Sequence, residues 1–275
     1  MRIDSSMMLQ QTSQTSIVQK RLSSIMQKLS TGLSINSAAD DAAGNAIAQR
    51  LEAMARGYKT SGDNIGDALS AMNIADAGAS DIGDALQRQR ELAVQASSDT
   101  LTSKDRQNLD QEYQQLNQEI ASAANGTQYN TMDLLNGQSP LSNGTGTIQA
   151  GASANSSSQL KSPNVDMTPN AIGAGGSIAT SAGAKAALNS IDSAMNKVQS
   201  QRATIGATSN RLDYADRLNS LMEINTTSAQ SQIQDLDYAQ STMDLASSNI
   251  LSQSSISAMS NFNQISRNTV LGLLQ

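Results

Sequence analysis

The chain lacks several residue types on which most protein sites depend. Its 275 residues include no Cys, no His and no Trp, and only one Phe. Without Cys there can be no disulfide or thiol chemistry, and without His there can be no Ser–His pair. Aromatic residues make up 2% of the chain. Because aromatic side chains supply much of the burial in a thick core, we expect long, slender helices that bury a narrow seam instead.

Basic clusters and long apolar runs are also scarce. The formal net charge is −6, so nucleic acid is not expected as a partner, since phosphate contacts need clustered Lys and Arg. The sequence has no apolar run of about 18 residues, so we expect no membrane span. The segment 1–6 is polar and is not followed by an apolar signal-peptide core. Export through a cleaved signal peptide is therefore not expected.

The possible metal ligands are confined to carboxylates and amides, which suit Ca²⁺ or Mg²⁺. Asp40–Asp41 and the pair Asp235 and Asp237 are the candidates, but neither has the spacing of a calcium loop. The favoured interpretation is that these acids lie at helix starts or on the surface. No set of acid, base and nucleophile can be assembled, so the chain is not expected to be an enzyme. We predict no catalytic residue, cofactor or metal.

Proline divides the chain into three parts. Pro140, Pro163 and Pro169 are its only prolines, and each would cost a helix interior about 3 kcal/mol. Residues 1–139 and 170–275 are therefore compatible with helix, whereas 137–185 is a Gly- and Ser-rich region of loops or a short β-hairpin. The predicted fold class is mainly α, with long antiparallel helices and a terminal coiled coil.

A heptad pattern marks the longest predicted helix. Apolar or small residues alternate at spacings of four and three, which is the signature of a coiled-coil seam. These residues are Ile47, Leu51, Met54, Tyr58, Ser61, Ile65, Ala68, Met72, Ala75, Ala79, Ile82 and Leu86. A third helix carries Leu109, Tyr113, Leu116, Ile120 and Ala123, and Asn125–Gly126 would end it. In the tail, Ile191, Met195, Val198, Ile205 and Leu212 have near-heptad spacing.

Both ends of the chain carry apolar stripes. The spacing of Val18, Leu22, Ile25 and Leu29 places them on one helical face, which Ile3 and Met7 extend across a polar gap. The last helix shows a stripe about 140° wide. It comprises Leu251, Ile256, Met259, Phe262, Val270, Leu273 and Leu274. Because an unpaired amphipathic helix exposes an apolar patch, we expect these faces to pack on each other, on neighbouring subunits, or on both.

Several motifs resemble those of bacterial flagellins, in the same order. Residues 29–44 resemble the N-terminal signature, in which a helix ends, turns at a Gly-containing loop and restarts. Residues 90–96 and 126–130 are similar to two further motifs, and 205–207, 210–212, 235–239 and 268–274 match the C-terminal part. The resemblance covers 1–137 and 185–275. Ser34 and Gly272 depart from the commoner family residues, which puts contacts between subunits in doubt but not the fold.

The resemblance implies a structural subunit that polymerises into the extracellular flagellar filament. Residues 1–43 and 233–275 would form an inner coiled-coil domain, and 44–136 and 186–232 an outer helical bundle around the short variable region 137–185. It further implies export in an unfolded state through the flagellar type III apparatus. The expected partners are other copies of the chain, an export chaperone on the C-terminal helix, and the filament cap and hook-junction proteins.

Members of the family are also sensed by a Toll-like receptor of host cells. The positions that match the receptor contacts are Arg88, Leu92 and Glu112. An alternative stays open, in which Leu92 packs inside the subunit and Glu112 faces a neighbouring subunit.

Two other functions compete with that of a filament subunit. A hook–filament junction protein would share the terminal helices but be present in few copies. A secreted adhesin with a coiled-coil stalk would be a stable monomer that forms no filaments.

Overall fold

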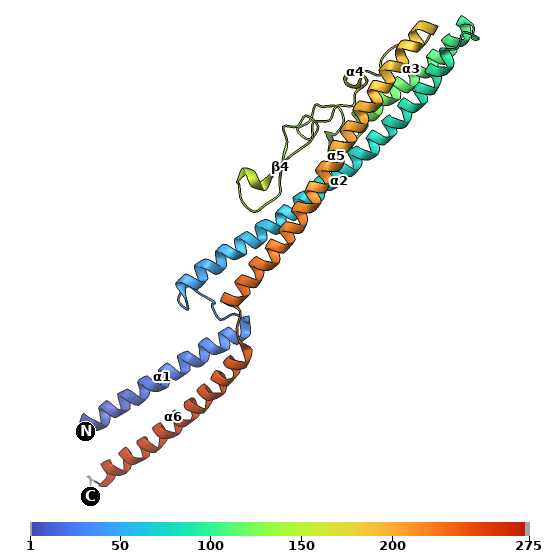
Figure 1. The fold of residues 1–275 in the computed structure, drawn as a ribbon. Helices are drawn as coiled ribbons and strands as arrows, with labels where there is room; N and C mark the ends of the chain where they lie inside the picture. Colours follow the sequence, from blue (N-terminus) through green and yellow to red (C-terminus); the bar gives the residue numbers. More distant parts are fainter. Residues whose placement is uncertain (1, 273–275) are drawn as a thin grey trace. The chain divides into compact units, whose positions relative to one another are not determined.

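Helices dominate the structure, as the fold class predicted. The computed structural model describes the backbone of residues 2–272 and the side chains of 9–265 and 267. The long helices are α1 (Arg2–Thr31), α2 (Ala42–Ala96), α3 (Ser103–Gly126), α5 (Ser181–Gln234) and α6 (Tyr238–Gly272) (Figure 1). The described residues contain no helix that is both long and apolar enough to cross a membrane.

The chain forms two compact units. The terminal unit comprises Met1–Ala53 and Asn225–Gln275, and the central unit comprises Met54–Ile224. Helices α2 and α5 therefore each contribute residues to both units.

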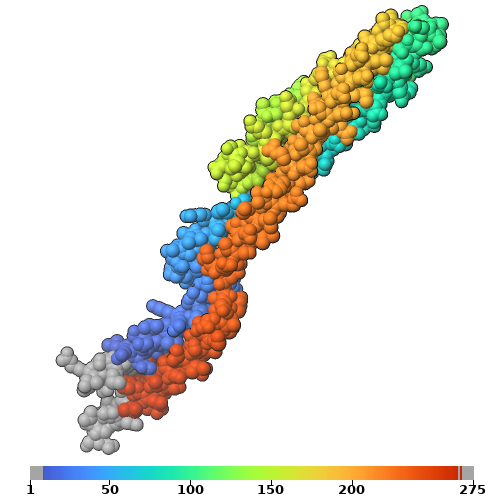
Figure 2. All heavy atoms as spheres, in the orientation of Figure 1, coloured from blue at the N-terminus to red at the C-terminus, as the bar shows by residue number. Residues whose placement is uncertain are grey.

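The connection between α3 and α5 contains the short elements, all in the central unit. Strand β1 (Gln128–Tyr129) pairs antiparallel with β2 (Met132–Asp133), and β3 (Thr147–Gln149) pairs antiparallel with β4 (Gln159–Lys161). A 3₁₀ turn at Ser156–Ser158 and helix α4 (Pro169–Ile172) complete it. This region lies along the flank of the long helices (yellow-green in Figure 2). The β1–β2 hairpin was not predicted, because two-residue strands show no alternation of apolar and polar residues.

The predicted heptad seam of α2 forms the central core. Every seam position from Ser61 to Leu86 is buried, and the same spacing continues through Gln89, Ala93 and Ala96, which are also buried. The opposing face of α5 repeats the pattern with Ala184, Ala187, Ile191, Ala194, Val198, Ile205 and Leu212. At the other end of the predicted seam, Ile47 and Met54 are exposed, so the seam prediction is wrong for these two positions. Spacing alone does not show where the covering partner stops.

Helix α3 and the loops close the core from the sides. Tyr113 and Ile120 of α3 are fully buried, and the Tyr113 hydroxyl donates to the Ala174 carbonyl at 3.3 Å. The Asp110 carboxylate of α3 accepts from the backbone N–H of Ile178 at 2.7 Å. Consecutive turns of α3 therefore hold the segment that leads into α5.

Two ion pairs join α2 to α5 along the outside of the seam. Arg202 Nε and Nη2 lie 2.8 and 3.2 Å from the two carboxylate oxygens of Asp76, a bidentate arrangement. Arg90 Nε lies 2.8 Å from Asp192 Oδ1. The hydrogen bond to Asp76 is the main cause that raises the pKa of Arg202 above its ordinary value. Since these side chains are about half exposed, the pairs set the register of the two helices more than they add stability.

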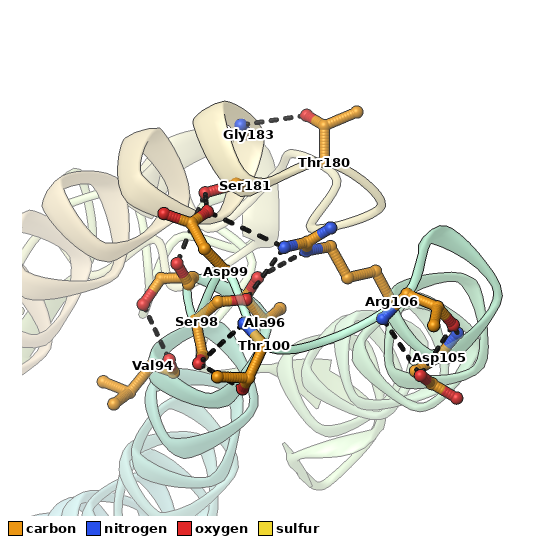
Figure 3. Close-up of polar contacts among 12 residues, drawn as sticks. Val94, Ala96, Ser98, Asp99, Thr100, Asp105, Arg106, Thr180, Ser181 and Gly183 are labelled. Carbon is orange, nitrogen blue, oxygen red and sulfur yellow. Dashed lines mark hydrogen bonds and ion pairs between the residues drawn. The ribbon is translucent and has the colours of Figure 1, made fainter.

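A network of polar contacts closes the end of the bundle where α2, α3 and the start of α5 meet (Figure 3). Arg106 of α3 donates from Nε to the Ala96 carbonyl at 3.0 Å and from Nη2 to the Ser98 carbonyl at 2.8 Å. It thereby satisfies the last carbonyl of α2, which has no partner inside the helix, and a carbonyl of the turn that follows. Ser181 of α5 donates to the Ser97 carbonyl at 3.3 Å.

Helix α3 starts with a capping box in the same region. The Thr102 hydroxyl accepts from the Asp105 N–H, and the Asp105 carboxylate accepts from the Thr102 N–H at 3.0 Å. Hydrogen bonds from Thr102 are the main causes that lower the pKa of Asp105.

In the terminal unit, the loop between α1 and α2 pairs with the short connection between α5 and α6. Helix α1 ends at Thr31 and is followed by Gly32, whose φ of +74° is a conformation that Gly adopts without strain. Leu33 then forms an antiparallel bridge with Asp235, with Ser34 N donating to Gln234 O at 2.7 Å and Leu236 N to Gly32 O at 3.0 Å. The Tyr238 hydroxyl donates to the Leu29 carbonyl at 3.1 Å. The helix end, Gly-containing turn and restart expected for 29–44 are thus present.

Candidate assembly surface

Helices α1 and α6 pack side by side in the terminal unit (Figure 1). On α1, the partly buried positions are spaced by four and three, as in a coiled coil. They are Gln11, Thr15, Val18, Leu22, Ile25 and Leu29. The predicted apolar face of α1 is therefore the face turned inward within this subunit. The side chains of Ile3 and Met7 lie outside the described residues.

The covered face of α6 contains four serines. Seven covered positions follow the four–three spacing, and we call them the serine seam: Ser241, Leu245, Ser248, Ser252, Ser255, Met259 and Phe262. Ser248 is only 2% exposed. Because the distance between two helices depends on the side chains at their contact, small side chains let α6 approach α1 closely.

Other large apolar side chains, on more than one side of each terminal helix, remain exposed. We call this set the outer apolar face: Leu9, Ile17 and Met26 of α1, and Met243, Ile250, Leu251, Ile256 and Ile265 of α6. Leu251 and Ile256 are 54% and 55% exposed. Exposed apolar groups that gather into a patch are typical of interaction surfaces.

The single stripe predicted for the last helix is divided in the structure. Met259 and Phe262 lie on the covered side with the serines, whereas Leu251 and Ile256 lie on the outer apolar face. The predicted stripe is wider than one helix can cover, which is the physical reason for the division. Val270 is in α6, but its side chain is outside the described residues, as are Leu273 and Leu274 entirely.

A second exposed apolar group, on α5, was not identified from the sequence. Tyr214, Leu218, Leu221, Met222 and Ile224 are all exposed. The spacing of the first three, four and then three residues, is a heptad pattern displaced from the buried seam of the same helix. That displaced pattern was the available signal.

One member of each acidic pair that was weighed as a metal candidate caps a helix start. Asp41 Oδ1 accepts from the N–H groups of Ala43 and Gly44, each at 3.0 Å, at the start of α2. Asp237 Oδ1 accepts from Gln240 N at the start of α6. Hydrogen bonds from the backbone of Ser37 and Asn36, in that order, are the leading causes that lower the pKa of Asp40. The contacts of Asp41 and Asp237 are those of N-capping carboxylates, whereas Asp40 holds the loop before α2.

The three positions that match receptor contacts have different environments. Arg88 Nη2 lies 2.8 Å from Glu112 Oε1, and its Nη1 lies 2.8 Å from Glu91 Oε2, all at the surface. The bond to Glu112 is the first cause that raises the pKa of Arg88. Leu92, however, is only 2% exposed and belongs to the central core. A direct contact through Leu92 would need it to leave that core.

These features define a class of protein: a helical subunit with long buried seams and with exposed apolar side chains on its terminal helices. Matches to two family models identify the family. Residues 4–140 match the bacterial flagellin N-terminal helical region, and 188–274 match the bacterial flagellin C-terminal helical region. The chain belongs to the bacterial flagellin family and is a structural subunit of the flagellar filament.

Similar proteins span nearly the whole chain. The flagellin of Halalkalibacterium halodurans is 35% identical over 87% of both chains, and that of Bacillus subtilis is 34% identical over 91% of both. A flagellar filament core protein of Treponema phagedenis is 32% identical over 91% of both.

Among solved structures, a putative flagellar hook-associated protein from Vibrio parahaemolyticus shares the fold. Its TM-score is 0.58 at 16% identity, covering 71% of this chain and 100% of that one. Bacillus cereus flagellin gives a TM-score of 0.49 at 29% identity, covering 57% of this chain and 88% of that one.

Proposed function

We propose that the subunit polymerises by burying the outer apolar face of α1 and α6 against other copies of the chain. The observation that supports this most directly is the division of α6 into a covered serine seam and exposed large apolar side chains. Pairing within one chain covers the serines of α6 together with Met259 and Phe262, and it leaves other large apolar groups with hydrophobic free energy still to gain. A contact between unlike surfaces that does not close on itself then extends into a helical filament.

The size of the effect can be estimated from two residues. Full burial of a Leu or an Ile contributes about 1.5–3 kcal/mol. Leu251 and Ile256 are already about half covered, so burying what remains exposed of both would contribute about 1.5–3 kcal/mol per subunit, or roughly ten- to hundredfold in critical concentration.

The test is the double variant Leu251→Ser, Ile256→Ser. Because both side chains are more than half exposed, the helicity and thermal unfolding of the monomer should stay close to those of the parent. The critical concentration, measured by sedimentation after seeding, should rise by roughly ten- to hundredfold. Gln253→Ser, at another exposed position of α6, is the matched control and should polymerise like the parent. Normal filaments from the double variant, seen by electron microscopy, would contradict the proposal.

A coarser deletion addresses the same surface. Removal of residues 251–275 should leave a soluble subunit that does not polymerise, because it removes Leu251, Ile256 and Ile265 together. Filaments of normal length from this truncated chain would count against the role of α6.

We also propose that the filament is extracellular and that the chain leaves the cell unfolded through the flagellar type III apparatus. An export chaperone would cover α6 before assembly, because its outer apolar face is open to solvent in the isolated subunit. Cap and hook-junction proteins would meet the same terminal helices at the ends of the filament. Trapping secretion intermediates and identifying the proteins crosslinked to α6 would test these partners.

Recognition by a host Toll-like receptor is a further proposal, and it rests on the retained Arg88, Leu92 and Glu112. In the structure Arg88 and Glu112 offer a surface ion pair. Leu92 is buried, so it would act indirectly, by packing in the core beneath the exposed residues of α2. An Arg88→Ala variant should then lower the signal of a receptor reporter assay without changing the fold. Absence of any signal from the parent monomer would dispose of the proposal.

A further inference from the structure

Three Asn–Gly pairs occur in one short stretch of the chain, and their surroundings differ. They are Asn125–Gly126, Asn136–Gly137 and Asn143–Gly144. Asn followed by Gly is the dipeptide most open to spontaneous deamidation, since Gly places no side chain in the way of the attacking backbone nitrogen. The three pairs have the same local chemistry, so folded structure decides which of them reacts.

We propose that Asn143–Gly144 is a site of spontaneous deamidation in the folded subunit. In this reaction the deprotonated backbone nitrogen of Gly144 attacks Asn143 Cγ and forms a five-membered succinimide. The side-chain nitrogen leaves as ammonia after taking up a proton. One water then opens the ring at either carbonyl, giving aspartate or isoaspartate. Water is the only co-reactant, and no oxidant or reductant is needed.

The side-chain carbonyl of Asn143 has two hydrogen-bond donors on the atom where negative charge develops. Thr145 N lies 2.9 Å and Thr145 Oγ1 lies 2.5 Å from Asn143 Oδ1. When the Gly144 nitrogen attacks Cγ, this oxygen becomes an oxyanion, and the two donors are already in place to stabilise it. Attack by an adjacent group on the same chain also needs no loss of translational freedom.

The leaving nitrogen is also unhindered. Within the part of the chain that the structure describes, Asn143 Nδ2 has no hydrogen-bond partner, and the side chain is partly exposed. Water can therefore reach the amide to protonate the departing ammonia and to open the ring. Gly144 has a φ of +74°, and its neighbour Thr145 is exposed.

Asn136 shows the opposite arrangement. It is buried, and its Nδ2 donates to Asp133 Oδ2 at 2.7 Å and to Asn125 Oδ1 at 3.4 Å. The carboxylate of Asp133 holds the nitrogen that would have to leave, and its negative charge opposes the developing oxyanion. One donor, Gln138 N at 3.0 Å, reaches the Asn136 carbonyl oxygen.

Asn125 is restrained by its helix. Gly126 is the last residue of α3, and Asn125 Nδ2 donates to the Ala121 carbonyl at 2.8 Å. The succinimide cannot form with helical backbone at this position, so the last turn of α3 would have to open first.

The modification would change a defined contact. Asn143 pairs with Asn164 in an antiparallel bridge, beside which Val165 N donates to Ser142 O at 2.7 Å. Isoaspartate lengthens the backbone by one atom at the bridge, and aspartate adds a negative charge to a chain of net charge −6. Either product would loosen the segment after Pro140 from the segment after Ser162 as the protein ages.

The experiment compares the three pairs within one sample. The full chain is incubated at mildly alkaline pH, folded or in denaturant, and sampled over weeks. Peptide mapping by mass spectrometry and enzymatic methylation of isoaspartate then give a rate for each site. In the folded chain Asn143 should react at least about tenfold faster than Asn136, whose amide nitrogen would have to break a hydrogen bond to a charged group. In denaturant the three rates should become similar.

A single substitution tests the role of the two donors. Thr145→Val removes the hydroxyl and keeps the backbone N–H, and it should slow the reaction at Asn143 by about fivefold, the rate equivalent of one net hydrogen bond. Thr147→Val, at a second exposed threonine two residues later, is the matched control and should leave the rate unchanged. The proposal is overturned if Asn143 reacts no faster than Asn136 and Asn125 in the folded chain. An unchanged rate in Thr145→Val would remove the oxyanion argument.

Discussion

Two residues of the β1–β2 turn have backbone conformations that differ in cost. Asn130 and Thr131 have φ values of +48° and +63°, as a two-residue hairpin turn of the mirror-image type requires. Asn tolerates positive φ because its short polar side chain can bond locally, whereas a β-branched residue is strained there. The chain therefore keeps a local strain at Thr131 that the rest of the central unit must offset.

Relief of this strain should be measurable. Thr131→Gly is expected to raise the free energy of unfolding by about 0.5–1 kcal/mol, the strain relieved less the extra freedom of Gly in the unfolded chain. Denaturant titration of the monomer followed by circular dichroism would measure the gain. Asn130→Gly, its neighbour in the same turn, should give a change near zero. Equal gains in both variants would show that β-branching is not the cause.

Arg106 offers a second test at the residue scale. Its side chain is 13% exposed, and its guanidinium reaches the Ala96 and Ser98 carbonyls together (Figure 3). Arg106→Ala should cost about 1–3 kcal/mol, since the Ala96 carbonyl loses its donor and the Ser98 carbonyl keeps only the Leu101 N–H at 3.5 Å. Arg106→Lys should recover part of this loss, because a single ammonium lacks the planar fork that spans both carbonyls. Thermal unfolding checks both variants, and an Ala variant as stable as the parent would rule out the capping role.

At the scale of the elements, the long helices are stabilised by packing rather than by propensity. Helix α2 contains six Gly, and each lowers helix stability by up to about 1 kcal/mol relative to Ala. Some of these glycines are needed for close approach and others are not. A Cβ on Gly78 would overlap Thr127 Oγ1 and lie 3.0 Å from Leu135 Cδ1, whereas a Cβ on Gly83 would meet nothing within 4 Å.

These two glycines provide an experiment with its own control. Gly83→Ala should stabilise the monomer by up to about 1 kcal/mol through helix propensity. Gly78→Ala should destabilise it by about 1–3 kcal/mol, because Thr127 and Leu135 must move in a packed core. Unfolding of both proteins in urea gives the difference. If Gly78→Ala were also stabilising, the close contact with the β1–β2 region would be wrong.

The helical seams could be predicted from spacing, but their partners could not. Ser61 through Leu86 were predicted as a seam and are buried, because a heptad pattern needs a covering helix along its length. The stripe of the last helix was predicted too, yet spacing gave no reason to expect Ser248 inside and Leu251 outside. A side chain's own hydrophobicity does not say which partner covers it, in this chain or in another. Only the structure could therefore show which apolar side chains of the last helix are covered within the subunit and which stay exposed for assembly.

At the scale of the whole molecule, the charge opposes the association that the apolar faces favour. Each subunit carries a formal net charge of −6, so copies repel at long range in dilute salt. The repulsion acts over the Debye length, about 30 Å at 0.01 M and about 8 Å at 0.15 M ionic strength. Contact between apolar faces lies well within either distance.

Salt should therefore promote polymerisation in two separable ways. Raising sodium chloride from about 0.01 to 0.15 M should lower the critical concentration severalfold by screening. Sodium sulfate at the same ionic strength should lower it further, since sulfate is excluded from protein surface and strengthens apolar burial. The double variant Leu251→Ser, Ile256→Ser should keep the first effect and lose much of the second. A critical concentration that rises with salt would point to ion pairs as the dominant contacts.

The pairing of α1 with α6 joins segments from opposite ends of the sequence. Leu33 and Asp235 close a loop of some two hundred residues. The contact must therefore first offset the conformational entropy that the chain loses when this loop closes. A chain that emerges amino end first, from a ribosome or from a narrow conduit, carries α1 without its companion until almost all of the polypeptide is out. The terminal unit is therefore completed last, and a chain that stops before α6 cannot complete it.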